Sequence, residues 1–162
     1  MTASGILVAG IGNIFLGDDG FGVEVAQRLA RRTLPEAVCV ADFGIRGFDL
    51  AYALLEDYAA VILVDALPRG GDPGTLYVLE PALDDLDEPA ADQMETHTMN
   101  PLNVLHLVRS MGGRPRRVLV VGCEPASVAL DEEGQIGLSA PVQAAVDGAV
   151  ELVESLVTRM LA

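Results

Sequence analysis

The stretch that decides the fold is residues 5–29, GILVAGIGNIFLGDDGFGVEVAQRL. It begins with an apolar run, Ile6 to Ala9, which predicts a buried strand. A glycine-rich loop at residues 10–13 follows, and a helix is expected after the adjacent carboxylates Asp18 and Asp19. A strand, a glycine-rich turn and a helix start form the arrangement that presents ligand sites in many α/β folds. Because two carboxylates repel anions, this loop suits a metal cation or the N–H groups of a helix start.

The rest of the chain alternates between apolar runs and amphipathic patterns. Further strands are predicted at Val38 to Ala41, Ala60 to Val64, Thr75 to Leu79 (turning back antiparallel) and Val118 to Gly122. Helices are predicted at Gly20 to Arg32, at Phe48 to Glu56, from the cap Asn100-Pro101 onward, and from residues 137–141, which open the last helix. The β-branched run Val61 to Val64 is typical of a central strand covered on both faces. The alternation predicts an α/β three-layer sandwich, with a mostly parallel sheet, one antiparallel strand and helices on both faces.

Composition narrows the range of functions. A chain of 162 residues, 51% of them hydrophobic, is expected to form a single domain over residues 1–162. The net charge is −14 and all ten basic residues are arginine, so neither nucleic acid nor an anionic membrane is an expected partner. The lack of lysine excludes a Walker A lysine, a Schiff base and a Ser–Lys dyad. Residues 1–17 are uncharged but have no basic start, so we expect no signal peptide and a cytoplasmic protein.

The usual nucleophiles and zinc motifs of hydrolases are missing. The sequence contains no G-x-S-x-G and no H-E-x-x-H. Its two cysteines, Cys39 and Cys123, form no C-x-x-C pair, which excludes a zinc finger or a thioredoxin motif. Both lie in strand-like runs, so we expect them to be small residues of the core.

Three residues are candidates for a metal site. Asp19 follows the first strand, Asp65 ends the central strand, and His97 lies just before the helix that Asn100 caps. Such positions meet at the carboxyl edge of a parallel sheet. Two carboxylates and one imidazole fit a divalent transition metal and leave positions open for substrate.

Other roles remain open for these and neighbouring residues. Asp18 could cap a helix instead of binding metal, and Asp18 and Asp19 could exchange roles. His106 lies well inside a predicted helix and is expected to be structural. Residues 80–96 are acidic and interrupted by proline, which predicts a solvated loop before His97.

The first motif also carries a resemblance. Gly10-x-Gly12-Asn13-x-x-x-x-Asp18-Asp19-Gly20-x-Gly22 resembles the N-terminal signature of the [NiFe]-hydrogenase maturation endopeptidases, which trim the C-terminal tail of the hydrogenase large subunit after nickel insertion. Shorter matches extend the similarity over nearly the whole chain: Asp42-Phe43-Gly44 with Gly47, Pro73-Gly74-Thr75, Gly122-x-x-Pro125 and Gly137-Leu138-Ser139. The chain departs from the pattern at Phe43, where many relatives have glycine.

The resemblance implies a function and a set of site residues. Asp19, Asp65 and His97 would be the catalytic and metal-binding residues, engaging nickel that is delivered in the substrate. Gly44, Arg46 and Gly47 would contact the substrate tail. The protein would then be a nickel-dependent endopeptidase for a [NiFe]-hydrogenase large-subunit precursor, expected to be a monomer.

Two alternatives belong to other functional classes. A non-catalytic metal-binding maturation chaperone would use the same ligands. A nucleotide-binding α/β module would use the loop at Gly10 and Gly12, but its fingerprint needs a third glycine where this chain has Phe15.

Overall fold

The computed structural model describes residues 5–83, 100–126 and 137–162. His97 and most of the acidic segment before it therefore lie outside the described residues. Within the described ranges, no helix combines the length and the apolar character that crossing a membrane requires.

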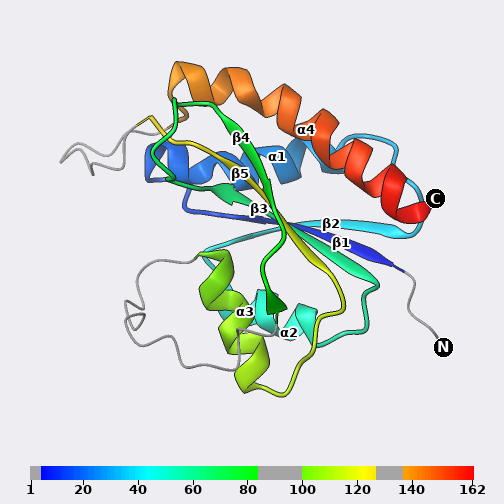
Figure 1. Ribbon diagram of the computed structural model, residues 1–162. Helices are drawn as coiled ribbons and strands as arrows, with labels where there is room; N and C mark the ends of the chain where they lie inside the picture. Colours follow the sequence, from blue (N-terminus) through cyan, green and yellow to red (C-terminus); the bar gives the residue numbers. More distant parts are fainter. Residues whose placement is uncertain (1–4, 84–99, 127–136) are drawn as a thin grey trace.

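A five-stranded sheet in the order β2-β1-β3-β5-β4 forms the middle layer (Figure 1). The elements are β1 (Ile6–Ile11), the short 3-10 helix η1 (Gly17–Gly20), α1 (Phe21–Ala30), β2 (Val38–Gly44), α2 (Gly47–Leu54), β3 (Ala60–Ala66), β4 (Leu76–Leu79), α3 (Pro101–Ser110), β5 (Val118–Cys123) and α4 (Ala140–Leu161). β3 lies at the centre, and every pairing is parallel except that of β4 with β5. The predicted fold class and the central position of Val61 to Val64 are confirmed.

Helices cover both faces of the sheet, as Figure 1 shows with α1 and α4 on one side and α2 and α3 on the other. On the first side, Phe21 and Leu29 of α1 pack with the valine stripe of α4, which includes Val146, Val150 and Val153. On the second side, residues of α2 and α3 pack against the opposite faces of the same strands. A strand that is covered twice has no polar face, which explains the continuous apolar runs in β1, β3 and β5.

The helix starts follow local capping chemistry. Asn100 caps α3 as predicted, since its Oδ1 accepts a hydrogen bond of 2.9 Å from the Asn103 N–H. Pro101 occupies the first turn, where its missing N–H leaves no hydrogen bond unmade. α1 begins at Phe21 and not at Gly20, because η1 occupies the preceding residues.

Two glycines bring α1 unusually close to the sheet. A Cβ at Gly10 of β1 would overlap the Gly22 carbonyl oxygen and lie 2.7 Å from the Cβ of Ala26. A Cβ at Gly22 of α1 would overlap the carbonyl oxygens of Ile11 and Val64. The backbone of α1 therefore lies directly on β1 and β3. Gly10 is occupied by this helix contact, which weakens the nucleotide-binding alternative for its loop.

The expected burial of Cys39 was wrong, whereas Cys123 is buried as expected. β2 is an edge strand, so it has a strand neighbour, β1, on one side only. The side chains of Val38 and Val40 pack against the core beneath α1 and α4, and the alternation of the strand turns Cys39 to the other face. On that face Cys39 is exposed.

Candidate functional site

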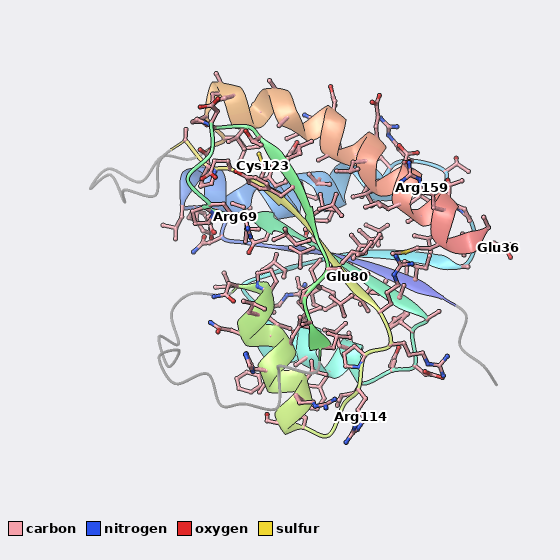
Figure 2. All side chains as sticks on the ribbon, in the orientation of Figure 1. Glu36, Arg69, Glu80, Arg114, Cys123 and Arg159 are labelled. Carbon is pink, nitrogen blue, oxygen red and sulfur yellow. The ribbon has the colours of Figure 1, made fainter. Side chains whose placement is uncertain are left out.

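The candidate site lies at the carboxyl edge of the sheet. β1, β2, β3 and β5 end there, and α1, α2, α3 and α4 begin there, since each helix runs antiparallel to the parallel strands beside it. Figure 2 shows Arg69 and Cys123 at this end, near the start of α4, and Glu36 and Arg159 at the opposite end. Residues that follow the strands are thus gathered from distant parts of the sequence.

Asp65 is a buried carboxylate near the end of the central strand. The residue is only 2% exposed, and its backbone pairs with Gly122 of the neighbouring strand β5. Its Oδ1 accepts a hydrogen bond of 2.8 Å from the Ala66 N–H. Burial, and secondarily the carboxylate of Asp19, raise the pKa of Asp65 well above its ordinary value, against the opposing effect of this hydrogen bond.

Asp19 lies on η1, close enough to Asp65 for its charge to act on that residue. Its Oδ2 accepts a hydrogen bond of 2.8 Å from the Asn13 N–H. Burial raises the pKa of Asp19, and the hydrogen bond from Asn13 partly opposes that rise. The carboxylate of Asp19 therefore lies close enough to disfavour the charged form of Asp65.

Gly12 allows the two acids to approach. Its φ of +140° lies in the region that side chains avoid, and a Cβ there would overlap the Asp19 carbonyl oxygen. The same Cβ would lie 3.6 Å from Asp65 Oδ1. The absence of a side chain at Gly12 therefore lets the backbone at Asp19 lie next to the end of β1, close to the Asp65 carboxylate of β3.

Asp18 has a different role from its neighbour. Its Oδ1 accepts a hydrogen bond of 2.7 Å from the Ser139 N–H, and its Oδ2 accepts bonds of 2.8 Å from the Ser139 hydroxyl and from the Ala126 N–H. Ser139 is the N-cap of α4 but makes no capping bond of its own to that helix. Asp18 therefore fastens η1 to the segment after β5 and to the residue before α4, and it caps neither η1 nor α1 with its side chain.

The pair Asp19 and Asp65 suits a cation. Two carboxylates with raised pKa values gain stability from a positive charge placed between them. In the part of the chain that the structure describes, no cluster of three or more His, Cys, Asp or Glu side chains is assembled. The proposed third ligand, His97, lies outside that part, three residues before Asn100, which opens α3 at this same edge.

The loop of the predicted substrate contacts lies next to the acid pair. The Gly12 N–H donates a hydrogen bond of 3.0 Å to the Gly44 carbonyl oxygen. Arg46 donates from Nη2 to the Asp42 carbonyl oxygen at 2.6 Å and from Nε to the Phe43 carbonyl oxygen at 3.2 Å. Its guanidinium also lies over the Phe43 ring, 5.7 Å from the centroid. Arg46 therefore shapes this loop, and its contact with the Phe43 ring contributes to that shape.

Glu124 is a site residue that the sequence analysis missed. It is buried just after β5, and its Oε1 accepts hydrogen bonds from the Arg69 N–H, the Gly71 N–H and the Tyr77 hydroxyl at 2.8–2.9 Å. Burial alone would raise the pKa of Glu124, but these hydrogen bonds together outweigh it and lower that pKa below its ordinary value. Glu124 thereby holds the loop that follows Asp65. The available signal was an acid directly after a buried strand, the same signal that identified Asp65.

Neither cysteine has the environment of a nucleophile. Burial, followed by the carboxylates of Asp18 and Glu124, raises the pKa of Cys123 to about 11, so its thiol stays protonated at neutral pH. Cys39 is exposed on β2, away from the carboxyl edge. His106 lies at a half-buried position inside α3.

We therefore expect thiol-directed reagents to leave intact the endopeptidase activity that the resemblance implies. Iodoacetamide should label Cys39 and spare Cys123 in the folded protein, as intact mass measurement can show. Serine-directed fluorophosphonates should have no effect either. A Cys39→Ser variant is the matched control, and a loss of activity in proportion to labelling, with the fold retained, would contradict the expectation.

Three comparisons with known proteins agree on the class of this protein, which is that of maturation proteases. The family model of the hydrogenase maturation proteases (HycI) matches residues 23–156. A putative hydrogenase maturation protease of Methanocaldococcus jannaschii is 33% identical over 157 residues, covering 94% of this chain and 96% of the relative. The chain belongs to the hydrogenase maturation protease family, which confirms the resemblance seen in its first motif.

Other relatives support the same assignment. The hydrogenase 2 maturation protease of Escherichia coli is 31% identical over 151 residues, covering 91% of this chain and 87% of the relative. The solved structure of the hydrogenase maturating endopeptidase HybD from E. coli superposes with a TM-score of 0.75 at 28% identity, covering 96% of this chain and 93% of that one. The similarity thus extends over nearly the whole chain in both sequence and fold.

Proposed function

We propose that the protein is a nickel-dependent endopeptidase that removes the C-terminal tail of a [NiFe]-hydrogenase large-subunit precursor after nickel insertion. The observation that carries the proposal is the acid pair, Asp19 and Asp65, held together over Gly12 at the carboxyl edge of the sheet. Family membership supplies the class of reaction and the class of substrate.

In this proposal the nickel is part of the substrate. Asp19, Asp65 and His97 engage the metal that the precursor carries, so that only a loaded precursor is held correctly. Both acids bind a cation as carboxylates, so their raised pKa values make metal binding dependent on pH. The bond to be cut is positioned relative to the metal, and the loop Gly44–Gly47 with Arg46 contacts the tail.

The test is cleavage of matched nickel-loaded and nickel-free precursors, with the mass of the product as the readout. We expect cleavage of the loaded precursor only. Among variants, Asp19→Asn and His97→Ala should lose most of the processing yield, and Asp19→Glu should be the mildest change because it keeps the carboxylate. His106→Ala is the matched histidine control and should process normally.

Two outcomes would contradict the proposal in different ways. Efficient cleavage of the nickel-free precursor would remove the metal from the mechanism. Tight binding of the loaded precursor without any cleavage would favour the non-catalytic chaperone.

A further inference from the structure

Exposed apolar side chains are concentrated at the carboxyl edge. Of the ten large hydrophobic residues that are exposed in the described ranges, six lie in the loops or first helical turns of this edge. We call these six the apolar rim: Ile14, Phe15, Leu16, Ile45, Phe48 and Leu102. Phe15 is 66% exposed and Phe48 is 67% exposed. Such a concentration is unusual for a surface with no partner.

The rim adjoins the acid pair through backbone contacts. Ile11 at the end of β1 pairs with Gly44 at the end of β2, so the segments carrying Phe15 and Phe48 leave the sheet side by side. Between them lies Gly12, which is bonded to Gly44 and covered by Asp19. A chain reaching the acid pair therefore passes over apolar side chains.

The rim segments are held with their side chains outward. In the first loop, Asn13 Oδ1 accepts a hydrogen bond of 2.9 Å from the Phe15 N–H, and its carbonyl oxygen accepts one of 3.1 Å from the Leu16 N–H. In the second loop, Arg46 bonds the carbonyl oxygens that precede it. Because these bonds order the rim before any partner arrives, docking would lose little conformational entropy.

Charge narrows the chemistry of the partner. The chain carries a net charge of −14, and Asp42 and Asp49 lie near Ile45 and Phe48 of the rim, at the end of β2 and in the first turn of α2. The positive charge of Arg46 is already engaged, with its Nη1 3.7 Å from Asp49 Oδ2. A complementary partner therefore combines apolar side chains with basic flanks, which disfavours an anionic membrane.

We propose that the apolar rim docks the C-terminal region of the precursor, as an apolar segment flanked by basic residues. This inference rests on the proposed function and names the surface that selects the substrate. Apolar anchors that are buried on docking supply most of the binding free energy, while the acid pair recognises the metal. Recognition of the tail and recognition of the metal are then separate.

The test measures binding and cleavage separately. Nickel-loaded precursor is immobilised, and the Kd is measured for the wild type, for Phe15→Ser/Phe48→Ser and for Leu161→Ser. Leu161 is the matched control, since it is 40% exposed at the far end of α4. We expect the double variant to bind at least tenfold more weakly and to show a raised KM. The control should match the wild type, and added salt should weaken wild-type binding.

Each outcome decides the inference. An unchanged Kd in the folded double variant would overturn it, as would equally tight binding of a precursor that lacks its C-terminal region. A concentration-dependent dimer that the double variant abolishes, with precursor binding unchanged, would assign the rim to a second copy of the chain. If the wild type binds but never cleaves, and the double variant still loses binding, the rim is a docking surface for the precursor and the proposed endopeptidase function is wrong.

Discussion

Asp65→Asn should reduce processing of the loaded precursor by about 100-fold, the upper end of the losses found when groups around a metal are changed, while leaving the metal-free protein more stable at neutral pH. The first effect follows from removing the charge that would face the nickel. The second follows from burial, which raises the pKa of Asp65 well above its ordinary value. A buried carboxylate without a cation destabilises the fold that contains it.

The sign of the stability effect follows from proton binding. Below the unfolded-state pKa of about 3.9, both states hold the proton of Asp65 and the group contributes no difference. As the pH rises above that value, the unfolded state loses its proton first, so the free energy of unfolding falls until the folded-state pKa is passed. Asparagine has no such proton. The variant should therefore gain stability over the wild type as the pH rises from 4 to 7.

Thermal unfolding of the metal-free proteins at both pH values measures this difference. Each 1 kcal/mol corresponds to a Tm shift of roughly 2–4 °C in a chain of this size. The amide oxygen can keep the hydrogen bond from the Ala66 N–H. Asp72→Asn, at an exposed position in the next loop, is the control and should change neither Tm nor processing. A destabilised Asp65→Asn at pH 7, or wild-type processing by it, would contradict the prediction.

Asp18→Ala should lower the free energy of unfolding by about 3 kcal/mol, because it removes a charged acceptor from three donors. The N–H groups of Ala126 and Ser139 would be left without this partner. Asp19→Ala, one residue along the chain, should cost less stability because it removes only the bond from the Asn13 N–H, and yet it should abolish processing. Two adjacent aspartates would then differ in what they control: Asp18 chiefly the free energy of unfolding, and Asp19 chiefly the processing yield.

Urea unfolding of the two variants provides the measurement. Ser139→Ala removes only the hydroxyl bond to Asp18, so it should lose about 1 kcal/mol and provides a graded control. Asp18→Asn keeps acceptor oxygen and should recover part of the loss. Equal urea midpoints for Asp18→Ala and Asp19→Ala would show that the two acids are not divided in this way.

The main strands and helices could be predicted because local chemistry determines them. The runs at Ile6 and Val61 are apolar throughout because helices cover both faces of the sheet. The cap at Asn100 is predictable because it acts three residues away, within one helical turn. Asp19 and Asp65 could be proposed as neighbours because parallel strands bring their carboxyl ends to one edge.

Features set by distant parts of the chain could not be predicted. The bond from Ser139 to Asp18 spans 121 residues, and no local pattern indicates it. Glu124 carries the same local signal as Asp65, but its donors come from the loop at Arg69 and from Tyr77. Cys39 lies in a run that looks buried, and only the strand order makes β2 an edge.

The contact of Gly10 and Gly22 has a consequence for how this chain can tolerate change. Core side chains differ in volume, and substituting them shifts the elements that they separate. No side chain separates the start of α1 from β1 and β3, so backbone atoms alone set that spacing. The distance between the turn bearing Asp19 and the strand bearing Asp65 is thus set by backbone contacts and not by the volume of core side chains. Core residues can therefore be substituted while the distance between the two carboxylates stays the same.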